Sequence, residues 1–159
     1  MSASYTIALD AMGGDNAPAI VVKGADLARR RFPDIRFRMF GDEARIMPLI
    51  ARRKRLREIT EIVHTDNAIS SDMTVSVAIR KGRQSSMQLA IDAVRDGDAE
   101  GIVSAGNTGA LMAMAKLSLR TLPGIHRPAI AAIFPSIRGE SVMLDLGANV
   151  ECSAENLVQ

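Results

Sequence analysis

The sequence predicts an open three-layer α/β/α sandwich built around a mostly parallel sheet. Short runs of aliphatic and β-branched residues alternate with Ala-rich stretches of helical periodicity, and Gly-rich turns separate them. A strand followed by a helix, repeated along the chain, favours parallel strands whose crossover helices cover both faces of the sheet. Aromatic residues make up only 3% of the chain and Trp is absent, so we expect an aliphatic core.

The predicted elements follow one another in strand–helix order. Tyr5 to Asp10 is a short apolar strand, and Pro18 suits the first turn of the helix that follows it. Ser85 is expected to cap a later helix. The polar stretch 65–84 is expected to be a loop with one or two helical turns near 75–79. Further strands are predicted at 35–40, 59–63, 101–104, 129–134 and 142–146, and helices at 18–31, 43–57, 85–94 and 110–120.

Length and composition limit the possible classes of protein. The 159 residues suffice for one domain with a real core, so we expect 1–159 to form a single α/β domain. The net charge of +2 argues against a nucleic-acid partner. The single Cys excludes a multi-Cys metal site, and we expect neither metal nor cofactor. No secretory signal and no run of about 18 apolar residues is visible, so a cytoplasmic location is expected.

Three polar, Gly-containing loops each follow a predicted strand: Asp10 to Pro18, Ser104 to Ala110, and Asp145 to Asn149. Such loops gather at the carboxyl edge of a parallel sheet, where open α/β proteins bind ligands. Gly allows close backbone approach, and free amides at the start of the next helix suit an oxyanion such as phosphate. Each loop alone also fits an ordinary tight turn. The sequence contains no G-x-x-x-x-G-K-[ST] and no G-x-G-x-x-G, which disfavours nucleotide triphosphatases and ordinary dinucleotide enzymes.

At these loops the sequence resembles the phosphate acyltransferase family of bacterial phospholipid synthesis, the PlsX family. The matching segments occur in the family's order and span nearly the whole chain. They are Asp10-Ala-Met-Gly-Gly-Asp15 with Ala17-Pro18, Ser85-Ser-Met87, Ser104-Ala-Gly-Asn-Thr-Gly-Ala110, Gly124-Ile-His-Arg-Pro-Ala129 and Asp145-Leu-Gly-Ala-Asn-Val150.

The resemblance implies transfer of a long acyl group from acyl carrier protein to inorganic phosphate. It also implies a Rossmann-like fold similar to isocitrate and isopropylmalate dehydrogenases and to phosphotransacetylases. Family members are homodimers associated with the membrane surface, here the inner face. They are about twice as long as this chain, so the resemblance covers an N-terminal half.

Attack of phosphate on a thioester needs positioning and stabilisation of an oxyanion more than a strong acid or base. The candidate catalytic donors are Asn107, Thr108 and Asn149. The candidate phosphate and substrate contacts are Asp10, Gly13, Gly14, Asp15, Gly106, Gly109, Arg127 and Gly147.

Several of these residues have a second interpretation. Asp10 and Asp15 either orient loop amides or accept the proton of a monobasic phosphate, and Asp15 also fits a helix cap. Arg127 either neutralises phosphate or is solvated. Cys152 has no base near it in sequence, so we do not expect a covalent acyl-enzyme. The basic run 52–57 is either a docking face for an acidic partner or a solvated helix end.

The predicted function is acyl-carrier-protein:phosphate acyltransfer. Two alternatives remain open at this point. One is a short-chain phosphotransacetylase-type enzyme of the same architecture. The other is an inactive dimerising or ligand-binding fragment that needs its other half.

Overall fold

The computed structural model describes residues 4–126, 128–144, 153–154 and 158. The chain divides into two compact units, Met1–Leu119 and Arg120–Gln159, and each is described here by itself. The first unit contains the four-stranded sheet and both of the loops that are described below as a candidate site.

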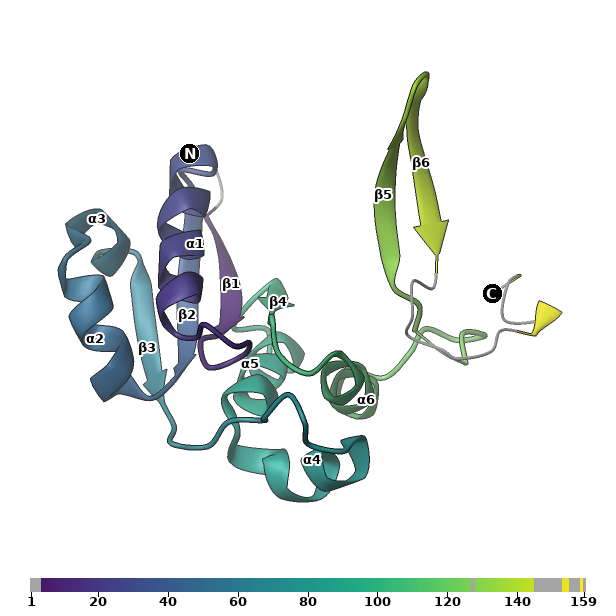
Figure 1. Ribbon diagram of the computed structural model, residues 1–159, viewed down its shortest axis with the longest axis horizontal. Helices are drawn as coiled ribbons and strands as arrows, with labels where there is room; N and C mark the ends of the chain where they lie inside the picture. Colours follow the sequence, from purple (N-terminus) through teal and green to yellow (C-terminus); the bar gives the residue numbers. More distant parts are fainter. Residues whose placement is uncertain (1–3, 127, 145–152, 155–157, 159) are drawn as a thin grey trace. The chain divides into compact units, whose positions relative to one another are not determined.

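The first unit alternates strands and helices as predicted, around a fully parallel sheet of order β3-β2-β1-β4 (Figure 1). The register sets Tyr5 of β1 opposite Ile35 of β2, and Ile7 of β1 opposite Gly101 of β4. The strands are β1 (Tyr5–Asp10), β2 (Ile35–Gly41), β3 (Thr60–His64) and β4 (Gly101–Val103). The helices are α1 (Ala19–Arg31), α2 (Glu43–Ala51), α3 (Lys54–Arg57), α4 (Val75–Lys81), the 3-10 helix η1 (Gly82–Gln84), α5 (Ser86–Arg95) and α6 (Thr108–Leu119).

Alternate residues of the strands face opposite sides of the sheet, and each side has its own core. Helices α1, α2 and α3 cover one side, where Leu9 and Phe37 of the sheet pack in one buried cluster with Val22, Ile46 and Leu56 of the helices. The core on this side is aliphatic apart from Phe37, in agreement with the prediction from composition.

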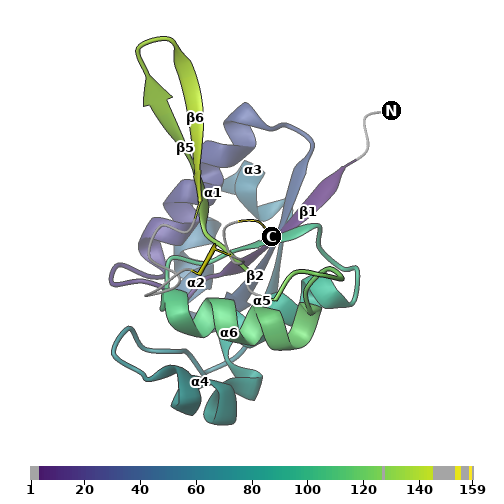
Figure 2. The same ribbon diagram turned by 90° about the vertical axis from the view of Figure 1, so that its right-hand side faces the viewer.

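Helix α5 covers the other side of the sheet. Ala8 of β1 and Phe40 of β2 pack with Ala90 and Ala93 of α5. As predicted, Ser85 caps this helix: its hydroxyl accepts a hydrogen bond from the Gln88 amide at 3.2 Å. Helix α6 packs against α5 and α4 (Figure 2).

One predicted helix, 43–57, is in fact two. Ile46 and Ile50 of α2 are fully buried, and one more helical turn would bring Arg53 and Lys54 to the same apolar face. The chain instead leaves the helix at Arg53, whose φ and ψ of −127° and 73° are not helical. The break turns Leu56 into the core, where it is completely buried.

The second unit contains β5 (Ala131–Ser136) and β6 (Gly139–Leu144), which form an antiparallel two-stranded sheet. Both strands were predicted, but as members of the parallel sheet. Only two residues, Ile137 and Arg138, connect them, and a parallel connection needs a crossover of a dozen residues or more. The short connection therefore requires a hairpin.

Candidate functional site

The strand order reverses between β1 and β4. From β1 the chain passes through α1 to β2 on one side, and β4 is reached through α5, on the opposite face of the sheet. Ligands of open α/β proteins bind outside the carboxyl ends of the strands at such a reversal. The two loops that leave these carboxyl ends are 11–18 and 104–107, which belong to two of the three predicted ligand loops (Figure 1).

The two loops are in backbone contact at Gly13 and Gly106. A side-chain carbon added to Gly106 would lie 3.3 Å from the Gly13 Cα. One added to Gly13 would lie 2.5 Å from Asp10 Oδ2 and 2.8 Å from Ser104 Oγ, closer than real Cβ atoms come. Gly14 has a φ of +96°, a conformation that glycine adopts without strain. These glycines are therefore required by the meeting of the loops.

Asp10 is the hydrogen-bonding centre of this contact. Its side chain is buried at the end of β1, with 2% of the residue exposed. Oδ1 accepts a 2.6 Å hydrogen bond from the Ser86 hydroxyl and a 3.3 Å bond from the Met12 amide. Oδ2 accepts a 2.7 Å bond from the Ser104 hydroxyl, which itself accepts from the Gly106 amide at 3.1 Å. Of the two predicted roles of Asp10, orientation of the loop amides is the one this geometry favours.

Asn107 holds two segments together at the start of α6. Its Oδ1 accepts a 3.0 Å hydrogen bond from the Ala110 amide, as a helix cap does. Its Nδ2 donates to the carbonyls of Ser71 at 3.2 Å and Met73 at 2.8 Å. The side chain that was predicted to be a catalytic donor therefore already has three protein partners, which favours a positioning role.

Thr108 and Gly109, the first residues of α6, are exposed beside these loops. Backbone amides of a first helical turn lack intrahelical acceptors, apart from those that a cap satisfies. Asn107 satisfies the amide of Ala110, so within the described residues the amides of Thr108 and Gly109 and the Thr108 hydroxyl remain available as donors to a ligand. Asp15 is also exposed at this edge.

The third predicted loop, with Gly147 and Asn149, lies outside the described residues, as do Arg127 and Cys152. The expectation that this loop shares the edge rested on 142–146 being a parallel strand. That premise is wrong, because β6 pairs antiparallel with β5 in a separate sheet. Ser86 and Ser104, which donate to the Asp10 carboxylate, were not predicted as site residues. They lie 76 and 94 positions from Asp10 in the sequence, so no local pattern signals these contacts.

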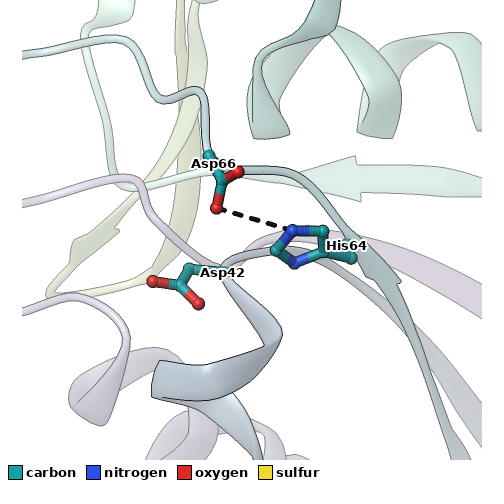
Figure 3. Close-up of side chains that lie close together, drawn as sticks. All are labelled: Asp42, His64 and Asp66. Atoms are coloured by element: carbon teal, nitrogen blue, oxygen red, sulfur yellow. Dashed lines mark ion pairs between the residues drawn. The ribbon is translucent and has the colours of Figure 1, made fainter.

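Asp42, His64 and Asp66 lie close together at the carboxyl ends of β2 and β3 (Figure 3). Asp42 caps α2 by accepting from the amides of Ala44 and Arg45. His64 Nδ1 accepts from the Glu43 amide at 3.2 Å, so its proton lies on Nε2, 3.4 Å from Asp66 Oδ1. The contacts of Asp42 and His64 therefore serve the start of α2, and we assign no metal to the cluster.

A family model described as "Fatty acid synthesis protein" matches residues 5–159 of the chain. The "Phosphate acyltransferase" of Rhodospirillum rubrum is 63% identical over 159 residues, which is 100% of this chain and 46% of the relative. The proteins of that name from Rhodospirillum centenum and Paramagnetospirillum magneticum are 62% and 56% identical over 159 residues, 100% of this chain and 45% of each relative. The chain thus spans slightly less than half the length of these relatives. The chain belongs to the fatty acid synthesis protein family, the PlsX family whose loop sequences it shares.

Proposed function

We propose that this chain forms part of an enzyme that transfers an acyl group from acyl carrier protein to inorganic phosphate, making acyl phosphate for phospholipid and fatty acid biosynthesis. The observation that carries the proposal is the contact of the Gly13 and Gly106 loops at the reversal of strand order. Relatives named phosphate acyltransferase support the identity of the reaction.

In the proposed reaction an oxygen of phosphate attacks the thioester carbonyl carbon. The resulting tetrahedral intermediate collapses with cleavage of the carbon–sulfur bond, and the thiolate of the carrier leaves. Phosphate is already anionic and a thiolate leaves readily, so the protein has to position the reactants and stabilise the oxyanion. We assign this to the amides of Thr108 and Gly109 and to the Thr108 hydroxyl. Asp10 and Asn107 keep the two loops in place.

An apolar groove of about 370 Å³ begins at the same edge, at Asp10 and Ala105, and follows α1 to Phe32. From Ile20 to Phe32 a helix advances about 18 Å. An extended chain advances about 1.2 Å per bond, so this length corresponds to an acyl chain of roughly 15 carbons. We therefore propose that the groove holds a long acyl group with its thioester at the loops.

The proposed donor is acyl carrier protein, and the proposed assembly is a homodimer at the inner membrane surface in the cytoplasm. The basic run 52–57 precedes β3, so it lies at the amino edge of the sheet, opposite the loops. A carrier docked there would hold its thioester far from Gly13 and Gly106, which favours a solvated helix end for this run. Among the described helices, none is long and apolar enough to cross a bilayer.

The test uses a fusion of residues 1–159 to the remaining part of the Rhodospirillum rubrum relative, compared with residues 1–159 alone. Long-chain acyl-carrier thioester and labelled phosphate are supplied, and acyl phosphate and free carrier thiol are measured together. We expect equal amounts of both products from the fusion and little from the 159-residue chain. Thiol release without acyl phosphate would mean hydrolysis and would refute the proposal.

A survey of acyl chain lengths distinguishes the proposed long-chain enzyme from the short-chain alternative. Gly24 lines the groove, and a carbon added to it meets no atom within 4 Å. Gly24→Leu in the fusion should therefore extend a side chain into the groove and shift preference towards shorter acyl groups. A fusion that prefers acetyl thioesters before the substitution would support the phosphotransacetylase-type enzyme instead.

A further inference from the structure

A second pocket, of about 330 Å³, opens beside the Gly13 loop on the side of α2. Gly14 and Asp15 form one part of its wall, Arg45 from the first turn of α2 forms another, and Ser70 and Ser71 lie on the segment between β3 and α4. All of these residues belong to the first unit.

Arg45 is held towards the loop. One of its terminal nitrogens, Nη2, donates a 3.2 Å hydrogen bond to the carbonyl of Ala17. Its backbone amide is capped by Asp42 Oδ1 at 3.3 Å, which fixes the start of the helix that carries it. Among residues 4–126 and the other described positions, Arg45 takes part in no ion pair, so its positive charge is not neutralised within that part of the chain.

Asp15 lines the same pocket and is exposed. No ion pair joins it to Arg45 in the described structure, although the two opposite charges border one pocket. A ligand that fits between them must offer negative oxygens to the guanidinium and a hydrogen-bond donor to the carboxylate.

We propose that this pocket binds a protonated phosphate ion, with Arg45 paired to its oxygens and Asp15 accepting its hydroxyl proton. Inorganic phosphate carries at least one proton near neutral pH, whereas sulfate carries none and would meet the Asp15 carboxylate with only acceptors. The pair therefore selects phosphate over sulfate. The identification of this ion with the attacking phosphate rests on the proposed function, and Gly14 joins the pocket to the loop contact.

The test is a titration of the 159-residue chain with inorganic phosphate and with sulfate, followed by calorimetry and by phosphorus NMR for phosphate. We expect Arg45→Gln to weaken phosphate binding about tenfold or more, the loss for a hydrogen bond to a charged group. Arg45→Lys should restore part of it. Arg52→Gln, the same charge change at the other end of α2, should bind like the wild type. Asp15→Asn should bring the phosphate and sulfate affinities close together.

Equal losses for Arg45→Gln and Arg52→Gln would overturn the assignment, and so would a wild-type chain that binds both anions equally or binds no phosphate at millimolar concentrations. Circular dichroism of each variant identifies any loss of fold. The acyl transfer assay of the fusion decides the proposed function separately. Selective phosphate binding without acyl transfer would leave the pocket and refute the function. Acyl transfer with an unchanged KM for phosphate in Arg45→Gln would support the function and refute the assignment of the attacking phosphate to this pocket.

Discussion

Ser104 donates a 2.7 Å hydrogen bond to Asp10, a residue 94 positions earlier in the chain. The same hydroxyl accepts from the Gly106 amide, so one serine joins the end of β1 to the loop after β4. Ser86 donates to the other oxygen of the carboxylate at the start of α5. Three segments that meet at the candidate site therefore share one buried carboxylate, and the geometry of the loops depends on it.

Asp10→Ala should reduce the free energy of unfolding by about 2–4 kcal/mol, because it removes charge-assisted hydrogen bonds and leaves the buried Ser86 hydroxyl without its acceptor. Asp15→Ala, an exposed carboxylate in the same loop, should change it by less than about 0.5 kcal/mol. Urea denaturation of both variants measures the difference. Similar small losses would show that the Asp10 cluster is not structural.

Gly13→Ala should destabilise the chain by about 1–3 kcal/mol, because the added carbon would lie 2.5 Å from Asp10 Oδ2 in a closely packed site. Gly24→Ala is the matched control inside α1, where a carbon meets nothing within 4 Å. It should stabilise the chain by about 0.5–1 kcal/mol through helix propensity. Thermal denaturation that showed a change in stability of the same sign for both substitutions would contradict the close approach at Gly13.

The sequence was informative wherever a local pattern decides the structure. The apolar run of β1 and the cap at Ser85 depend on neighbours in the chain, and both were predicted correctly. The segments around Gly13 and Gly106 were predicted correctly as loops. The rule that loops after parallel strands gather at the carboxyl edge then predicted correctly that two loops far apart in sequence lie together. It holds here because β1 and β4 are parallel.

The rest depended on contacts that no local pattern contains. The break in 43–57 follows from which face of α2 is buried, and the run of basic residues alone does not reveal that face. The hairpin of β5 and β6 was predictable, because the seven residues between the predicted strands 129–134 and 142–146 are too few for a parallel crossover. The Asp10–Ser86 hydrogen bond joins residues 76 positions apart, and the pocket position of Arg45 depends on how α2 packs beside the loop.

Asp26 gives a pH dependence that can be tested. Burial raises the pKa of this carboxyl, but hydrogen bonds and charge from Arg29 and Arg30 outweigh burial, and the pKa is lowered overall. A lowered pKa in the folded state means that the stabilisation is present above the unfolded value, near pH 4, and is lost as the pH falls through the folded value. Asp26→Asn should therefore lose stability at pH 7 and lose less than the wild type between pH 4 and pH 2. Urea denaturation that showed the same loss of stability between pH 4 and pH 2 in the wild type and in Asp26→Asn would contradict this.

Asn107 and Thr108 are adjacent, but the structure gives them different roles. Asn107 caps α6 and holds Ser71 and Met73, so Asn107→Ala should lower the free energy of unfolding by about 1 kcal/mol or more and loosen the 71–73 segment. Faster hydrogen exchange at 71–73 and at Ala110, relative to the wild type, measures that effect. Unchanged exchange would mean that these hydrogen bonds contribute little.

Thr108→Val keeps the shape of the side chain, and Thr108 is exposed at the start of α6, so stability should change by less than about 0.5 kcal/mol. In the fusion with the Rhodospirillum rubrum region, the same substitution removes one preorganised donor to the oxyanion. Turnover should therefore fall by about ten- to a thousandfold. Thr108→Ser, which keeps the hydroxyl, is the control and should retain most of the activity. Wild-type turnover in Thr108→Val would show that the Thr108 hydroxyl is not a donor to the oxyanion.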